Sequence, residues 1–470
     1  MSINARSANL ADSGFVLACR NHEVSRKFST NEVAITVEEH EKWYQARIKQ
    51  TDGQNFWIFS AGDMNLGYVR LDASIDFPNN YEISICVSPN FQNLGHGKEM
   101  LTKSIFMHFE KYPLSKIIAR VNKSNSASLS LFIKAGFTKN ILLDDFILLE
   151  LVNKNLRFVF RADASNEIGT GHVQRSLGLI EELIDLKYEV FFVGDTSEIP
   201  WVTNHIKFLG FSKILDNEQE FTSSVKTDVL IFDSYTIPVN SEFINKFNWL
   251  LVVVIQDLYS PKYDAHLTVH PGVAENLYIK SNLRVLSGPE YVPLRKSILR
   301  SSKRLQSSEL IITVIGGGVD RIGFAEEMSK QLKVLPGSFT VNFFTNNATG
   351  IEIDSRFKIF EFGSHLDEIG NVSELVFCTA SSTALEFIAR GCAVGICCGS
   401  SNQEQYYEAL PKLGVSKPIG IFRGMKWIFD SIAIQDLVSS KSLRDQLSIK
   451  SIQLIDFNGA KRIIKEIMSF

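Results

Sequence analysis

Short apolar runs and amphipathic segments alternate along most of this chain. The run LRFVF at residues 156–160 predicts a strand, and residues 175–186, RSLGLIEELIDL, have apolar positions at helical spacing. The glycine-containing segment between them therefore lies at a strand-to-helix junction. Junctions of this kind are where α/β proteins place their ligands and their chemistry.

The first third of the chain has a different pattern. Alternation typical of antiparallel strands covers residues 55–61, 66–73 and 81–89, with polar turns between them. A helix with an apolar face is predicted after the glycines that follow the third strand. Residues 116–137 then predict another strand and a second helix.

Two polar stretches divide the pattern. One lies near residue 153, and the other is a basic, serine-rich linker at residues 296–310. A chain of 470 residues is long enough for two or three domains. We expect units at residues 1–153, 156–300 and 308–470, the last two being doubly wound α/β lobes with a ligand cleft between them.

Charge and composition restrict the partners. The net charge is −3 and no basic stripe is present, so nucleic acid is not an expected partner, whereas a small anionic ligand stays open. No segment resembles a signal peptide, and the aliphatic run at residues 249–255 is too short to span a bilayer. We expect a soluble, cytoplasmic protein without membrane contact and leave its oligomeric state open. The cysteines lack metal-ligand spacing, so we expect buried free thiols and no metal site; they are Cys19, Cys86, Cys378, Cys392, Cys397 and Cys398.

Two motifs mark the first unit. Residues 92–97, QNLGHG, form a QxxGxG pattern at a predicted helix start, where glycines let a diphosphate approach the N–H groups of the first turn. An ordinary glycine-rich helix start has the same pattern. A second motif, NSASLSLFIKAGF, follows at residues 125–137 and favours the ligand-binding interpretation.

Together the motifs resemble the Gcn5-related N-acetyltransferase (GNAT) superfamily over residues 1–150. The resemblance implies acetyl-CoA as co-substrate, with its pyrophosphate on the glycine loop and its pantetheine arm beside the second motif. Residues 20–28 and 36–48 are similar to the PseH-like branch, which acetylates amino groups of nucleotide sugars. The implied acetyl-CoA-binding residues are Val87, Gln92, Gly95, His96, Gly97, Asn125 and Ser128.

Acetyl transfer needs a neutral amine and a stabilised oxyanion. The resemblance assigns the oxyanion to a backbone N–H at Val87 or its neighbours. Glu82 is the candidate for accepting the ammonium proton through water, although a solvated strand-edge carboxylate would have the same signature. Phe132 stands where the family often has a tyrosine acid. Either another group or solvent protonates the thiolate, or this unit is weakly active, or it only binds its ligands and regulates its neighbour.

The junction at residues 160–177 carries the pattern RxDxxxxIGxGHxxR, which resembles PseG-type UDP-sugar hydrolases. That resemblance implies the glycosyltransferase-B architecture of two Rossmann-type lobes, shared with MurG. The sequence departs from the family pattern at residues 256–257 and 269–273. These departures bear on which sugar is the substrate more than on the type of reaction. A glycosyltransferase using the same UDP cleft is an alternative. Further motif matches follow in family order: DVLIFDSY (228–235), QDL (256–258), LSGPEYVPLR (286–295), IGGGVD (315–320), SSTALEF (381–387) and SSNQEQ (400–405).

The last unit has the features of a nucleotide site. Three glycines follow the predicted strand at residues 310–315 and can admit a phosphate close to the backbone. Hydroxyls at a helix start can hold a diphosphate, and a glutamate on the same helical face can accept both ribose hydroxyls. A helix cap with a capping box would explain the same hydroxyls and glutamate. The residues assigned to the nucleotide are Gly316, Gly317, Gly318, Ser382, Thr383, Glu386 and Gln403.

His172 is the candidate general base on water. At a helix N-terminus the dipole disfavours the imidazolium, although a lone glycine-flanked histidine is more often structural. Hydrolysis needs an activated water at the anomeric carbon and a stabilised leaving diphosphate. We expect Asp163 to orient His172 or the water, and Tyr235 and Asn402 to contact the sugar or position the nucleophile. Two further residues are assigned to substrate binding, Gly171 and Arg175.

The fusion of the two resemblances is itself informative. In pseudaminic acid synthesis, PseH-type enzymes acetylate the 4-amino group of UDP-4-amino-4,6-dideoxy-N-acetyl-β-L-altrosamine, and PseG-type enzymes then release UDP from the product. Two consecutive steps on one chain raise the local concentration of the intermediate. The sequence therefore predicts a bifunctional enzyme with a UDP-activated amino sugar and acetyl-CoA as its substrates.

Overall fold

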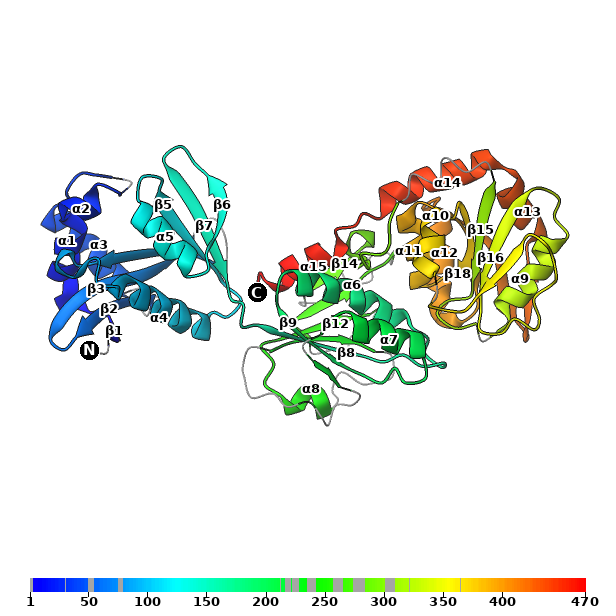
Figure 1. Cartoon of the computed structure of the whole chain (residues 1–470), viewed down its shortest axis with the longest axis horizontal. Helices are drawn as coiled ribbons and strands as arrows, with labels where there is room; N and C mark the ends of the chain where they lie inside the picture. Colours follow the sequence, from blue (N-terminus) through cyan, green and yellow to red (C-terminus); the bar gives the residue numbers. More distant parts are fainter. Residues whose placement is uncertain are drawn as a thin grey trace. The chain divides into compact units, whose positions relative to one another are not determined.

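The structure is a computed structural model in which the chain forms two compact units (Figure 1). Met1–Lys154 together with Met468–Phe470 form the first, and Asn155–Ile467 form the second. Both are α/β, which confirms the expected fold class. The described residues are 3–29, 31–49, 55–74, 79–211, 213–215, 221, 228–234, 242–256, 265–273, 284–300, 309–320, 322–363 and 365–470.

A seven-stranded sheet of order β1-β2-β3-β4-β5-β7-β6 forms the first unit. Its parallel pair joins β4 to β5, and this register ends at Glu82 opposite Ile118. Beyond that point β4 stays in register with β3 as far as Val87, whereas β5 continues beside β7. The two central strands therefore diverge after Glu82. The strands are β1 (Asn4–Ser7), β2 (Phe56–Ala61), β3 (Met64–Ala73), β4 (Asn80–Val87), β5 (Lys116–Asn122), β6 (Thr138–Leu142) and β7 (Phe146–Val152).

Helices pack on this sheet through their apolar faces. Met100 and Leu101 of α4 are fully buried with strand residues such as Phe59 and Val69. The helix begins after Gly95, whose φ of 84° lies in the left-handed region that favours glycine. The helices are α1 (Ser13–Asn21), α2 (Glu23–Arg26), α3 (Val37–Lys49), α4 (His96–Lys111) and α5 (Ser126–Lys134).

The second unit contains two sheets, and the first has the order β10-β9-β8-β11-β12-β13-β14 with every pair parallel. All six positions of β11 are buried, as expected for a parallel sheet covered on both faces. Its elements are β8 (Arg157–Ala162), β9 (Glu189–Val193), β10 (Lys213–Leu215), β11 (Asp228–Asp233), β12 (Leu251–Ile255), β13 (Leu267–His270), β14 (Arg284–Ser287), α6 (Gly171–Asp185), α7 (Pro200–Phe208), α8 (Glu242–Lys246) and the 3-10 turn η5 (Pro289–Tyr291).

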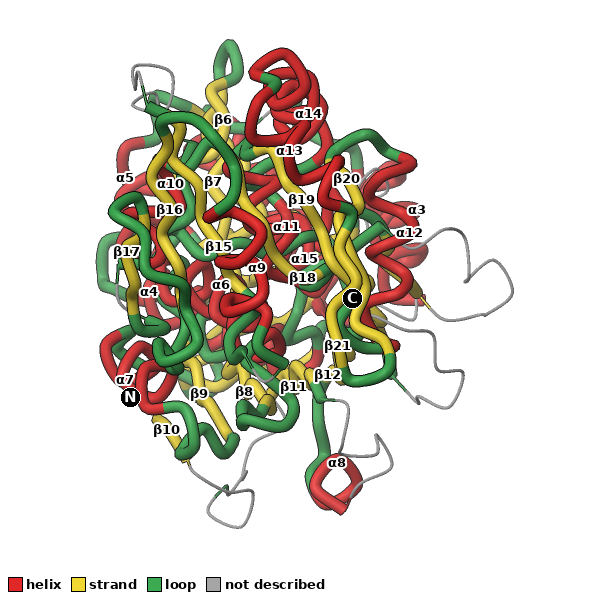
Figure 2. The backbone as a smooth tube through the Cα atoms, turned by 90° about the vertical axis from the view of Figure 1, so that its right-hand side faces the viewer, coloured by secondary structure: helices red, strands yellow, loops and turns green. Residues whose placement is uncertain are grey.

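The other sheet has the corresponding order, β17-β16-β15-β18-β19-β20-β21, and only its last pair is antiparallel. Helices α13 and α14 lie beside β19 and β20 (Figure 2). Its elements are β15 (Leu310–Ile315), β16 (Phe339–Phe344), β17 (Phe357–Phe360), β18 (Leu375–Thr379), β19 (Ala393–Cys398), β20 (Ser416–Arg423), β21 (Lys426–Phe429), α9 (Phe324–Lys333), α10 (Leu366–Val372), α11 (Ser382–Arg390), η7 (Ser401–Gln403), α12 (Glu404–Lys412), α13 (Ser431–Ser439), α14 (Lys441–Leu454) and α15 (Gly459–Ile467).

Helix α15 returns to the first of these sheets and packs against α6 and η5 (Figure 1). Gly459 permits the approach, because a Cβ atom there would lie 2.1 Å from the Val292 carbonyl oxygen. Arg462 also donates a hydrogen bond of 2.8 Å to the Glu290 carbonyl. The sequence segment expected to form the last lobe therefore ends on the preceding one.

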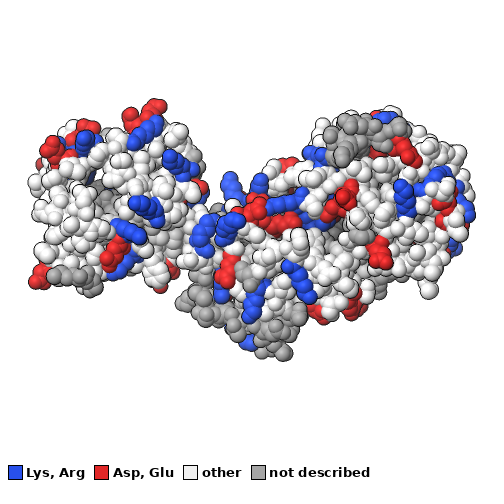
Figure 3. All heavy atoms as spheres, in the orientation of Figure 1, with Lys and Arg blue, Asp and Glu red and all other residues white. Residues whose placement is uncertain are grey.

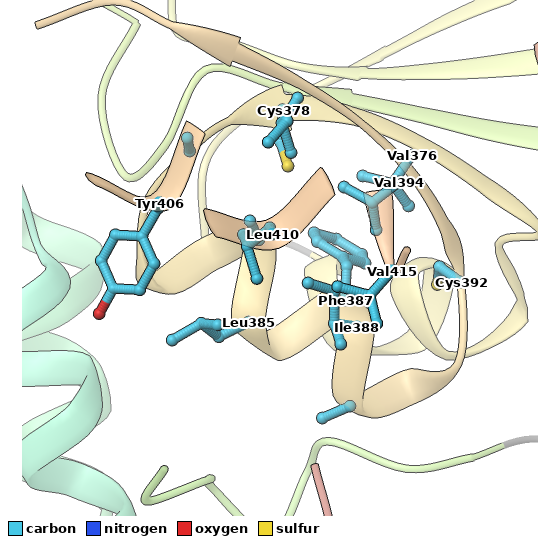
Figure 4. Close-up of a cluster of buried hydrophobic side chains, with 14 of the residues drawn as sticks. Val376, Cys378, Leu385, Phe387, Ile388, Cys392, Val394, Tyr406, Leu410 and Val415 are labelled. Atoms are coloured by element: carbon cyan, nitrogen blue, oxygen red, sulfur yellow. The ribbon is translucent and has the colours of Figure 1, made fainter. Parts of the chain in front are cut away.

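Side chains of β18, β19, α11 and α12 form one large core cluster (Figure 4). Tyr406 lies at its edge, and its hydroxyl points away from the other labelled side chains. That hydroxyl lies 3.4 Å from the Pro271 carbonyl oxygen, so the edge of this core meets the loop after β13. Four cysteines are buried and Cys86 and Cys398 are half-buried, all as free thiols. No described helix is both long and apolar enough to cross a bilayer.

Candidate active site

The loops that follow the strands of both sheets line one cavity of about 1040 Å³ in the second unit. In each sheet the first strand in sequence lies in the middle, beside the fourth, so the chain turns to opposite sides at that point. Ligands of doubly wound proteins bind in the crevice at such a switch point. Every described second-unit residue assigned from the sequence lines this cavity except Asp163.

His172 forms a buried pair with Asp233 at the switch point between β8 and β11. Its Nδ1 lies 2.5 Å from Asp233 Oδ1, and the imidazole is 3% exposed. Arg175 donates to both oxygens of the same carboxylate, over 2.6 Å from Nε and 2.6 Å from Nη2. The carboxylate accepts a hydrogen bond from the Nδ1–H group of His172. In a neutral imidazole with its proton on Nδ1, Nε2 carries the free lone pair. The arrangement orients an imidazole as a base.

Local structure explains how these residues meet. Asp233 is the last residue of β11 and lies in register with Ala162, the last residue of β8. Gly169, with φ of 80°, closes a tight turn after β8 and lets α6 begin at Gly171. The first turn of α6 thereby brings His172 to the end of β11.

Among the described residues, no hydrogen bond joins Asp163 to His172. Its Oδ1 accepts from Arg161 Nη1 at 2.6 Å and from the Asp195 backbone N–H at 2.9 Å. Of the two roles expected of Asp163, the contact with His172 is made by Asp233 instead, and orientation of the water stays a prediction. Tyr235 lies outside the described residues.

The glycine loop after β15 lies at the switch point between β15 and β18. Thr379, at the end of β18, donates from Oγ1 to the Gly316 carbonyl over 3.2 Å. Gly317 has φ of 110°, and a Cβ atom on Gly318 would lie 1.8 Å from Thr170 Oγ1. The loop therefore needs glycine both for its conformation and for its approach to the turn before α6.

The start of α11 exposes hydroxyls to the cavity. Ser381 is the N-cap residue of α11 but makes no side-chain capping bond, so the capping box considered from the sequence is not formed. Ser382 and Thr383 line the cavity, as does Gly171, where a Cβ atom would lie 3.0 Å from Ser382 Oγ. The Ser382 hydroxyl is thus close to the start of α6.

Glu386 belongs to a charged network at the cavity wall. Arg295 Nη2 donates to its Oε2 over 3.1 Å, while Arg295 Nη1 donates to Asp367 over 2.7 Å. Arg390, which is fully buried, lies 2.5 Å from Asp367. Burial alone would raise the pKa of Asp367, but the positive charges of Arg295 and Arg390 leave it below its usual value. The network holds the Glu386 side chain in a defined position.

The loop after β19 supplies amides. Ser400 Oγ donates to Asn402 Oδ1 over 2.5 Å, and Gln403 Oε1 accepts from the Gly399 N–H at 2.8 Å. Both residues line the cavity. One oxygen of each amide is therefore already used in shaping the loop.

Several residues of the site had no role predicted from the sequence. Asp233, which bonds to His172, is one of them, although an acidic residue ending an entirely buried strand was an available signal. Arg295 and Gln174 lie within the family motifs but had no predicted role. Helix α7 was not assigned to the site, because nothing local indicates which face of a helix meets a cavity; its lining residues are Trp201, Asn204, His205 and Phe208. Burial lowers the pKa of His205, and the charge of Arg295 lowers it further.

In the first unit, the predicted cofactor residues gather where β4 and β5 diverge. Gln92 Nε2 donates to the Val87 carbonyl over 3.2 Å. A Cβ atom on Gly97 would lie 3.4 Å from Val87 and 3.6 Å from Leu131 of α5. The end of β4, the start of α4, which includes His96, and the middle of α5 are therefore neighbours.

The remaining first-unit residues have structural partners. Asn125 caps α5 by accepting from the Ser128 N–H at 3.0 Å. Glu82 lies on central strand β4 and forms a half-exposed ion pair with Arg120 at 3.5 Å, so it is solvated but does not lie at a sheet edge. Phe132 is buried in the core. No cluster of three or more His, Cys, Asp or Glu able to hold a metal ion occurs in the described ranges.

Comparison with known proteins gives a match for each of two parts of the chain. Residues 4–138 match the sequence model of a family described as "Acetyltransferase (GNAT) domain". The first unit has a GNAT fold. The part of the chain after the GNAT domain is similar to a UDP-2,4-diacetamido-2,4,6-trideoxy-β-L-altropyranose hydrolase of Campylobacter jejuni. The two are 20% identical over 274 residues, which cover 55% of this chain and 97% of the relative.

Several solved acetyltransferases are similar to the GNAT domain. The protein yncA of Salmonella typhimurium, solved with its cofactor acetyl-CoA, is 22% identical, covers 32% of this chain and 94% of its own, and has a TM-score of 0.29. An N-acetyltransferase of Staphylococcus aureus is 20% identical, covers 33% and 100%, and also scores 0.29. Spermidine N-acetyltransferase of Vibrio cholerae is 17% identical, covers 32% and 95%, and scores 0.29.

Proposed function

We propose that this chain is a bifunctional enzyme of pseudaminic acid synthesis. Its GNAT domain transfers an acetyl group from acetyl-CoA to the 4-amino group of UDP-4-amino-4,6-dideoxy-N-acetyl-β-L-altrosamine. Its second unit hydrolyses the diacetamido product to free sugar and UDP. The observation that carries the proposal is the buried His172–Asp233 pair, whose His172 lines a cavity also lined by the Gly316–Gly318 loop.

Hydrolysis uses the two lobes from opposite sides. His172 Nε2 takes a proton from water, the water oxygen forms a bond to the anomeric carbon, and the bond from that carbon to the diphosphate oxygen breaks. Asp233 accepts the Nδ1–H and stabilises the imidazolium that forms, as in other Asp–His pairs. The electron pair of the broken bond leaves on UDP.

The departing UDP is held by the second lobe. Backbone N–H groups of the Gly316–Gly318 loop and the hydroxyls of Ser382 and Thr383 are suited to the diphosphate. Glu386, oriented by Arg295, accepts the ribose hydroxyls. Asn402 contacts the sugar or the water from the next loop, as does Tyr235 in our proposal.

Acetyl transfer uses the divergence of β4 and β5. Acetyl-CoA lies between the strands, with its pyrophosphate at the start of α4 and its thioester carbonyl near the Val87 N–H. Glu82 accepts the amine proton through water, and the amine nitrogen then bonds to the carbonyl carbon as the thiolate leaves. Phe132 has no proton to donate, so solvent or another group protonates the thiolate.

The charge distribution suits small substrates. On the face that Figure 3 draws, Lys and Arg side chains are mixed with Asp and Glu side chains. The whole chain carries a net charge of −3. Neither feature favours a polyanion, which requires a continuous basic surface.

Product analysis tests the proposal. Incubation of the full chain with the UDP-amino sugar and acetyl-CoA should yield free coenzyme A, UDP and the diacetamido sugar by mass spectrometry. A glycosyltransferase would release little UDP from the diacetamido substrate in water alone, so UDP release without an acceptor separates these functions. Absence of UDP release under both conditions would contradict the hydrolase assignment.

A variant separates the two active sites. Gly97→Glu should abolish acetyl transfer, because a carboxylate beside Val87 and Leu131 repels the cofactor diphosphate. UDP release from pre-acetylated substrate should be unchanged. Loss of both activities in a folded variant, as judged by circular dichroism, would point to a single shared site.

A further inference from the structure

Gln174 is a buried amide in the wall of the cavity. It is 7% exposed and lies in the first turns of α6, between His172 and Arg175 along the chain. Among the described residues, neither its Nε2 nor its Oε1 has a hydrogen-bond partner. Its backbone N–H donates a 3.0 Å hydrogen bond to the Thr170 carbonyl, so the missing hydrogen bonds are those of the side chain.

Such a side chain is unusual in a folded protein. Buried amides are nearly always hydrogen-bonded, and an unmet one destabilises the fold. An apolar side chain of similar length, such as methionine, would fill the same space without that penalty. A polar ligand that enters the cavity and meets both atoms is a sufficient physical reason for a glutamine here.

The position limits which part of the ligand this is. Gln174 belongs to the lobe that carries His172, whereas the glycine loop and the start of α11 belong to the other lobe. A neutral carboxamide is also a poor partner for a diphosphate, which Arg, Lys or backbone N–H groups bind better. Gln174 therefore faces the sugar end of a nucleotide sugar.

We infer that Gln174 binds an N-acyl substituent of the sugar, with Nε2 donating to the acyl carbonyl oxygen. Oε1 then accepts from a neighbouring hydroxyl or amide N–H of the sugar. This inference rests on the proposed function and adds the residue that recognises an N-acyl group of its substrate. A free sugar ammonium offers only donors and leaves Nε2 unmet, so it is a weaker ligand for this position.

A cycle that combines enzyme variants with substrate analogues tests the contact. UDP release is measured for the parent and for Gln174→Met, each with the diacetamido substrate and with analogues in which one acetamido group at a time is a free amine. With the full substrate, Gln174→Met should lower kcat/KM by about tenfold to hundredfold, the range for leaving one buried polar group unmet. The same loss should be nearly absent with the analogue that lacks the contacted acyl group.

The outcomes are distinct. A loss that disappears with either single analogue supports the contact and identifies the acyl group. A loss of equal size with every substrate, or no loss, overturns it and leaves Gln174 hydrated or structural. Failure of the parent to release UDP from any of these compounds would instead refute the proposed hydrolase.

Ser176 provides a matched control on the same helix. Its hydroxyl is also buried and lacks a partner in the described part of the chain, but it does not line the cavity. Ser176→Ala should leave kcat/KM within about twofold for every substrate. Gln174→Met should in addition melt at a higher temperature than the parent without ligand, because an unmet amide is removed. If the methionine variant does not fold, Gln174→Asn, which retains a shortened amide, replaces it in the cycle.

Discussion

The two sheets of the second unit share a strand order but differ in chemistry where the chain changes direction. Near the ends of β8 and β11 lie buried polar side chains that bond to one another: His172, Asp233 and Arg175. At the end of β15 and β18 they are glycines and hydroxyls, with Thr379 bonded to Gly316. Both sheets have a switch point of the same topology. The residue types at each switch point decide which side is suited to reaction and which to binding.

The difference also affects how each site is held. Asp233 is fully buried and its oxygens bond to two cationic or proton-donating partners, so removal of one partner leaves a charge uncompensated. The glycine loop is held by neutral hydrogen bonds and by close packing against Thr170. We therefore expect steep effects of substitution on the first side and graded effects on the second.

The largest effect is expected for His172→Ala. UDP release should fall roughly 10²–10⁴-fold, the scale for loss of a positioned general base. UDP affinity by calorimetry should change little, because the nucleotide contacts that we propose lie on the other lobe. With the amino sugar and acetyl-CoA together, the variant should accumulate acetylated UDP-sugar. Near-normal UDP release would make His172 a structural histidine and remove the contrast between the lobes.

Asp233→Asn should destabilise the second unit by about 3 kcal/mol, because Arg175 is left as a buried charge without a carboxylate. Urea denaturation of the full chain measures this change. The double variant Asp233→Asn with Arg175→Met should recover part of the loss, since no buried charge then remains. An Asp233→Asn variant as stable as the parent would show that this pair is open to solvent.

Gly318→Ala should have an intermediate effect. The new methyl group would collide with Thr170, whose side chain makes no capping bond to α6, and overpacking of this kind costs about 1–3 kcal/mol. UDP affinity and melting temperature should both fall. Adding Thr170→Gly removes the colliding atoms and should restore both. Without such rescue, the close approach of the two loops is not what requires a glycine.

The smallest effect is expected for Thr379→Val, which keeps the shape but removes the hydrogen bond to Gly316. The loss should be about 1 kcal/mol or less. Calorimetry should show UDP binding weakened by about fivefold or less, with the rate of UDP release at saturation unchanged. A reduced rate at saturation would place chemistry on the second lobe as well.

Much of this architecture was predictable because it depends on near neighbours in the chain. The alternation at residues 55–61 and 66–73 predicted β2 and β3, and the apolar run ending at Phe160 predicted β8. Glycines before α4 and α6 indicated helix starts, which require only local backbone freedom. The motifs that carry the family resemblance also contain residues that line the cavity, among them His172, Gly317 and Ser382.

The sequence by itself determined the α/β class, the positions of the glycine turns and the residue types available at the cavity. Only the tertiary structure decided that Asp233 rather than Asp163 bonds to His172, since these partners lie 61 residues apart and meet because β11 packs beside β8. It also decided that α15 packs against α6 and that Gln174 is a buried amide in the cavity wall. Periodicity reports which face of an element is apolar, but the partner of each side chain depends on strand order and register, which no local pattern contains.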